Sequence, residues 1–143
     1  IKMLTVHASG GTKMMGAAKN AVRGTDIEIF AVTALTSLSD EDSLKISQRS
    51  AAEQVNAMIE LAEEAGIDGV VCSPHELDLV CSRKSLQSIT PGIRLSQSED
   101  DQTRIMTPRE AILKGANYIV IGRPITNALN ISEALIEIYN SIY

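Results

Sequence analysis

Residues 27–35 read IEIFAVTAL, an apolar run rich in β-branched side chains in which Glu28 is the only charge. Such a run, without regular alternation of polar and apolar residues, is typical of a strand that is buried on both faces. Four further stretches of the same kind predict four more strands: MLTVHA (3–8), GVVCS (69–73), SITPGI (88–93) and YIVIG (118–122). The sequence therefore predicts five buried strands.

The segments between these strands have helical periodicity. Residues 44–65 predict one long helix, because small and apolar residues recur along a single stripe of it, and the acidic, serine-rich residues 37–43 are expected to form the turn before it. TPRE at 107–110 predicts a helix start, with a capping Thr, a Pro at the first position and a Glu three residues after the cap. A last amphipathic helix is expected around residues 134–142.

Buried strands that alternate with amphipathic helices indicate an α/β protein with a parallel sheet covered by helices. No linker or low-complexity tract interrupts the 143 residues, so we expect a single domain over 1–143. Two architectures fit. One is a complete, flavodoxin-like open sheet of five strands. The other is the C-terminal part of a (β/α)8 barrel, since a whole barrel needs about 250 residues.

The composition excludes several classes of protein. The chain has 13 Lys and Arg against 18 Asp and Glu, a net charge of −5, which argues against a protein that binds nucleic-acid backbones. No apolar run approaches the ~20 residues of a membrane span, so no membrane partner is expected. Two cysteines do not form a disulfide framework, which favours a reduced, cytoplasmic setting.

The residues that follow the strands are the candidate ligand contacts, because parallel α/β folds bind ligands at the carboxyl ends of their strands. After the last strand come Gly122, Arg123 and the helix-starting Pro124. A glycine backbone, exposed amides and an arginine are the parts of a phosphate site, although an ordinary turn with a surface arginine also fits. His7 is expected to be a structural histidine and His75 to be exposed.

Arg94 and a polar loop, residues 95–105, follow the fourth strand. This loop is a candidate lid with ligand contacts, and the alternative is a solvated acidic loop. Its acidic residues 99–101 have no nearby His or Cys and lack the spacing of a calcium loop, so no metal site is predicted.

Taken together, six motifs resemble orotidine 5′-phosphate decarboxylase of the bacterial type over essentially the whole chain. The motifs are LTVHASGGTKMM (4–15), AVTALTS (31–37), VCSPHE (71–76), TPGIRL (90–95), DDQTRIMTP (100–108) and YIVIGRPIT (118–126). The resemblance implies a (β/α)8 barrel, a truncated parallel barrel here, whose strands 4 to 8 are the five predicted strands.

The family is a carboxy-lyase that converts orotidine 5′-monophosphate to UMP in pyrimidine biosynthesis, without metal or organic cofactor. Carried over by position, the resemblance implies five substrate-binding residues. Thr36 would hydrogen-bond the pyrimidine, Arg94 would be a ligand-binding position, and Gln102 would reach the phosphate and base from the closing loop. The backbone of Gly122 and the side chain of Arg123 would hold the phosphate.

The sequence departs from the family in one respect. The catalytic Lys and Asp residues of the family lie in a D-x-K-x-x-D-I-P type segment on strand 3, and no such segment occurs in these 143 residues. The chain starts with Ile1 directly before an apolar run, so we expect strands 1–3 to be missing ahead of it. No catalytic residue is therefore assigned, and the chain alone is expected to be inactive.

The resemblance also implies a cytoplasmic enzyme that is a homodimer at full length. Two other functions remain possible at this point: a related phosphate-binding barrel enzyme that acts on a sugar phosphate, or a non-catalytic, flavodoxin-like binding module.

Overall fold

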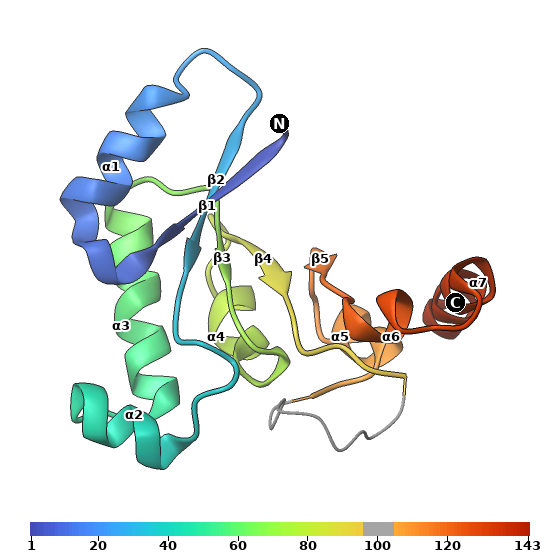
Figure 1. Cartoon of the computed structure of the whole chain (residues 1–143). Coiled ribbons are helices and arrows are strands. Elements are labelled where there is room, and N and C mark those ends of the chain that lie inside the picture. Colours follow the sequence, from blue (N-terminus) through green and yellow to red (C-terminus); the bar gives the residue numbers. More distant parts are fainter. Residues whose placement is uncertain (96–104) are drawn as a thin grey trace.

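Five strands form one parallel sheet in the computed structural model, which describes residues 1–95 and 105–143 (Figure 1). They are β1 (Met3–His7), β2 (Glu28–Val32), β3 (Gly69–Val71), β4 (Gln87–Thr90) and β5 (Tyr118–Ile119). All five predicted strands are confirmed, and each ends one to three residues before the predicted end. After β4, for example, Pro91 and Gly92, with a φ of 80°, turn the chain out of the sheet.

The strands lie in the order β1-β2-β3-β4-β5, so each pairs with its neighbour in sequence. A flavodoxin-like sheet has the order 2-1-3-4-5, with helices on both faces. Sequential parallel strands joined by right-handed crossovers place all their helices on the same side, as in a barrel. The strand order therefore excludes the flavodoxin-like alternative.

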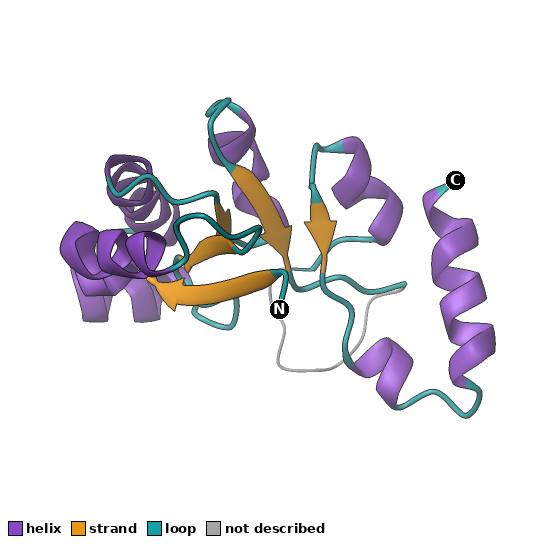
Figure 2. Ribbon diagram, turned by 90° about the horizontal axis from the view of Figure 1, so that it is seen from above, coloured by secondary structure: helices purple, strands orange, loops and turns teal. Residues whose placement is uncertain are grey.

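Helices follow the strands and lie outside the curved sheet (Figure 2). They are α1 (Gly11–Ala21), α2 (Asp40–Ser47), α3 (Ala51–Glu64), α4 (Leu77–Cys81), α5 (Pro108–Leu113), α6 (Arg123–Thr126) and α7 (Ile131–Ile142), with single 3-10 turns at Ala8–Gly10 and Pro74–Glu76. The side chains of Ile29 and Val70 face this layer and pack among the buried residues of α1, α3 and α4. This contact is the hydrophobic core.

The prediction of one helix over residues 44–65 is wrong. The structure has two helices, α2 and α3, which are separated at Gln48, a left-handed residue with a φ of 57°. Each helix has its own capping box: the Ser39 and Ser50 hydroxyls accept from the amides three residues on, and the carboxylates of Asp42 and Glu53 accept from the serine amides. Both boxes are visible in the sequence as S-x-x-D and S-x-x-E, and they start two helices because each satisfies otherwise unpaired amides.

The sheet is strongly curved. Phe30 on β2 and Tyr118 on β5 meet edge to face, with ring centroids 6.1 Å apart and an interplanar angle of 85°. In a flat sheet these strands, three spacings apart, would be separated by about 14 Å. The two rings therefore meet across the concave side, on the face opposite the helices, which is the interior of a barrel.

The capping boxes predict an acid-sensitive fold. Hydrogen bonds from Ser50 lower the pKa of Glu53, and equivalent bonds from Ser39 and Thr107 lower the pKa of Asp42 and Glu110. A carboxyl whose pKa is lower in the folded state stabilises the fold above its unfolded pKa, and this stabilisation is lost as the pH falls through the folded value. Thermal unfolding should therefore shift to lower temperature as the pH falls below about 4.

The matched variant is Glu53→Gln, which keeps an acceptor for the capping box but does not titrate. Its unfolding temperature should depend less on pH between about 5 and 3 than that of the unmodified chain. The control is Glu64→Gln, which removes an exposed carboxylate from the other end of α3. Equal pH dependence in the two variants would contradict the prediction.

Candidate functional site at the carboxyl ends of the strands

Three of the predicted ligand residues follow their strands at the same separation along the sequence. Thr90 pairs with Ile119 across β4 and β5, and Arg94 and Arg123 each lie four residues beyond that pair. Thr36 lies four residues beyond the end of β2. Because all strands are parallel, these residues follow the same edge of the sheet.

Arg94 is held by its backbone and is buried, with 8% of its surface exposed. Its amide donates to the Met106 carbonyl (3.0 Å), and the Met106 amide donates to the Gly92 carbonyl (3.2 Å). These bonds form a parallel bridge between Ile93 and Met106. The bridge holds Ile93, after β4, and Met106, before α5, next to each other and close to Arg94. Gln102 lies outside the described residues.

The guanidinium of Arg94 donates to the carbonyl of Ile93 (2.9 Å). A buried cation needs such partners, because an isolated charge is expensive to remove from water. The arginine is thus anchored within its own turn at the edge of the sheet.

Gly122 and Arg123 form the turn from β5 into α6, as predicted. The Gly122 carbonyl accepts from the amides of Ile125 (2.9 Å) and Thr126 (3.0 Å), which defines a single helical turn. A Cβ atom built on Gly122 would meet no described atom within 4 Å, so packing does not require glycine there. Both residues are exposed. The glycine leaves its backbone open to an approaching group.

Thr36 is half-buried at the end of the β2 segment. Thr33, three residues earlier, has a structural role, since its hydroxyl donates to the Val71 carbonyl (2.7 Å) and extends the pairing of β2 with β3. His75 is exposed, as predicted, but the prediction of a structural His7 is wrong. His7 is the last residue of β1 and lies on the exposed edge of the sheet, so its side chain is not enclosed by the core.

The two arginines at this edge are chemically suited to binding an anion. Two arginines follow neighbouring strands, and an arginine can bind a phosphate through two parallel hydrogen bonds. Among residues 1–95 and 105–143, no three His, Cys, Asp or Glu side chains gather as metal ligands. In the same part of the chain, no helix combines the length and apolar character that crossing a membrane requires.

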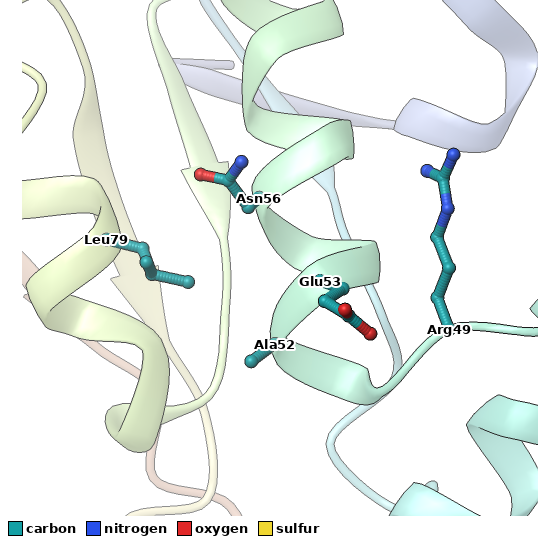
Figure 3. Close-up of a pocket in the computed structure, with 5 residues that line it drawn as sticks. All are labelled: Arg49, Ala52, Glu53, Asn56 and Leu79. Carbon is teal, nitrogen blue, oxygen red and sulfur yellow. The ribbon is translucent and has the colours of Figure 1, made fainter.

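A groove of about 430 Å³ lies elsewhere, in the helix layer between α3 and α4 (Figure 3). Its lining residues are Arg49, Ala52, Glu53, Asn56 and Leu79. Asn56 already accepts from Arg83 (3.2 Å) and donates to Glu60 (2.9 Å), while Glu53 accepts from Ser50 in the capping box. The side chains of Asn56 and Glu53 therefore already serve the α3 cap and contacts within α3 and with the loop after α4, and none of the predicted ligand residues lines the groove.

Comparison with known proteins identifies the family. Residues 1–138 match the model of the orotidine 5′-phosphate decarboxylase / HUMPS family. The chain belongs to this family. Among the relatives of the decarboxylase family are the orotidine 5′-phosphate decarboxylases of Saccharophagus degradans (50% identity over 95% of this chain and 60% of the relative) and of a Wolbachia pipientis strain (47% over 91% and 59%).

Solved structures agree with this assignment. The orotidine 5′-phosphate decarboxylase of Lactobacillus acidophilus superimposes with a TM-score of 0.80 and 35% identity, over 99% of this chain and 63% of that one. The enzyme from Sulfolobus solfataricus, at 20% identity and a TM-score of 0.71, shares the fold. The prediction of a partial (β/α)8 barrel is confirmed. The chain spans about 60% of the length of the relatives named above.

Proposed function

We propose that this chain supplies the phosphate- and pyrimidine-binding half of an orotidine 5′-monophosphate decarboxylase, a carboxy-lyase that forms UMP. The observation that carries the proposal is the placement of Arg94 and of the Gly122–Arg123 turn four residues beyond one strand pair, on one edge of the sheet. The 44–50% identity to relatives named as this decarboxylase supports the nucleotide as substrate. The sugar-phosphate alternative shares the phosphate chemistry but lacks this support.

In this proposal Arg123 and the Gly122 backbone hold the phosphate, and Arg94 contacts the bound nucleotide. Thr36 bonds the pyrimidine, and Gln102 contacts phosphate and base. The phosphate is remote from the carbon that loses CO2, so its binding energy contributes to rate by positioning the substrate and closing the site. Binding by these residues requires no metal or organic cofactor.

The proton donor is not in this half. The sequence has no D-x-K-x-x-D segment, so the proposal assigns the lysine and aspartates to the remainder of the barrel. The 143-residue chain alone should bind UMP without decarboxylating orotidine 5′-monophosphate. We place the complete enzyme in the cytoplasm, as a homodimer, on the basis of its membership of this biosynthetic family.

Calorimetric titration with UMP tests the proposal. Arg123→Ala should weaken UMP binding about tenfold to a hundredfold, the cost of losing a charged hydrogen bond of about 1.5–3 kcal/mol. The control is Arg23→Ala, which makes the same charge change in the loop before β2, at the amino ends of the strands. It should leave the affinity for UMP unchanged.

Three outcomes would contradict the proposal. Equal losses in Arg123→Ala and Arg23→Ala would show a non-specific charge effect. Tighter binding of ribulose 5-phosphate than of UMP would favour the sugar-phosphate alternative. Production of UMP from orotidine 5′-monophosphate by the chain alone would show that the proton donor lies within these residues.

A further inference from the structure

One row of side chains crosses all five strands near the carboxyl edge of the sheet. The register pairs its members from strand to strand, and they are His7, Val32, Val71, Ile89 and Tyr118. The first three are the last residues of β1, β2 and β3. The row therefore lies next to the edge at which parallel α/β folds bind their ligands.

This row faces the concave side of the sheet. The ring of Tyr118 meets that of Phe30 on this side, and Phe30 lies two residues before Val32 on the same strand. Side chains two apart on a strand share a face, and so do paired residues of neighbouring strands. Val6 faces the other way, since it packs against the core beneath the helices. The imidazole of His7, the next residue, therefore points to the concave side, which is the interior of the barrel.

The middle of the row is an apolar wall, because Val32, Val71 and Ile89 are its members on β2, β3 and β4. Ligand pockets are lined mainly by apolar side chains, together with a few polar groups that set the orientation of the ligand. His7 is the polar group at the β1 end of this wall. A neutral imidazole carries one donor and one acceptor, so it can bond an N–H or a carbonyl of a heterocyclic base.

β1 lies opposite the residues assigned to the phosphate. Gly122 and Arg123 follow β5, and β1 and β5 are four strands apart at the two ends of the sheet (Figure 1). In an eight-stranded barrel, four strands apart means opposite sides. A nucleotide whose phosphate is bound after β5 therefore extends its base toward β1 and β2. Thr36, assigned to the pyrimidine, follows β2, the strand that pairs with β1.

We propose that His7 contacts the pyrimidine of the bound nucleotide and favours a ligand with a base over a bare sugar phosphate. The assignment rests on the proposed function, because the position of the phosphate sets the direction in which the base extends. The direction of the imidazole itself depends on the pairing of β1 with β2 and not on the strands that complete the barrel.

Calorimetric titration of the 143-residue chain with UMP and with ribose 5-phosphate, which lacks the base, tests the assignment. His7→Ala should weaken UMP binding about threefold to tenfold, the range for one neutral hydrogen bond, and change the affinity for ribose 5-phosphate less than about twofold. His7→Gln, which keeps a donor and an acceptor, should recover part of the loss. The control is His75→Ala, which removes an exposed histidine from the 3-10 turn at Pro74–Glu76 and should leave both affinities unchanged.

Arg123→Ala separates this assignment from the proposed function, since it should weaken the binding of both ligands. If it does so while His7→Ala weakens neither ligand, or weakens both equally, the assignment of His7 is overturned and the phosphate site stands. If Arg123→Ala weakens neither ligand, or if the chain binds neither, the proposed function fails and the assignment of His7 fails with it. Both histidines are exposed, so their variants should retain the helical circular dichroism of the unmodified chain.

Discussion

Replacing Phe30 with alanine is expected to lower the free energy of unfolding by about 3–5 kcal/mol, the range for truncating a buried phenylalanine. Phe30 is the only phenylalanine in the chain and is fully buried. It lies on the concave side of the sheet, where its ring meets that of Tyr118 and covers Gly69. Its loss would remove the contact between β2 and β5 across that side.

Denaturant unfolding followed by circular dichroism measures this effect. Phe30→Leu keeps most of the apolar volume and should cost less than half as much as Phe30→Ala, since conservative core changes cost less than about 1.5 kcal/mol. The control is Leu44→Ala, an apolar truncation of a side chain that is 52% exposed on α2. A Phe30→Ala variant as stable as Leu44→Ala would show that the concave side contributes little to the fold.

Gly69→Ala is the second substitution with a large expected effect. A Cβ atom at this position would lie 2.4 Å from the Phe30 ring and 2.5 Å from the backbone oxygen of Gln87. The ring can move, but the Gln87 oxygen belongs to the neighbouring strand β4 and cannot move without disturbing its pairing with β3. We expect a loss of stability at or above the upper end of the usual cost of overpacking, about 1–3 kcal/mol.

Two further variants make this prediction specific. Gly16→Ala, in α1, adds the same methyl group where no described atom lies within 4 Å, and it should stabilise the helix by about 0.5–1 kcal/mol. Combining Gly69→Ala with Phe30→Leu should relieve the clash with the ring and leave the clash with the backbone. The double variant should therefore be less stable than Phe30→Leu alone. Full recovery to the level of Phe30→Leu would show that the ring is the only obstacle.

Much of the candidate site could be predicted from sequence because it depends on local pattern. Thr36 and the turn formed by Gly122 and Arg123 each follow an apolar strand within a few residues. Parallel strands bring such ends to one edge of the sheet. The burial of Arg94 could not be predicted in this way. It depends on the bridge between Ile93 and Met106, two residues separated by a 12-residue segment without apolar periodicity.

The errors have equally physical causes. Small and apolar residues recur along one stripe within residues 44–65, so periodicity predicts a single helix there, although the capping boxes at Ser39 and Ser50 mark two starts. The sequence predicts a structural histidine at His7, but β1 lies at one end of the sheet and pairs with β2 alone in the described part, which leaves His7 exposed. Enclosure depends on which strands are neighbours, and a local pattern does not contain that information.

The sequence by itself determined the strands, the helix starts at the capping boxes of Ser39, Ser50 and Thr107, and the residues at the strand ends, because each depends on side chains within a few positions of one another. The tertiary structure decided the order of the strands and the curvature that brings Phe30 to Tyr118. It also decided the burial of Arg94 beside the bridge between Ile93 and Met106. These features depend on contacts between residues far apart in the chain, whose energies come from packing and burial in three dimensions.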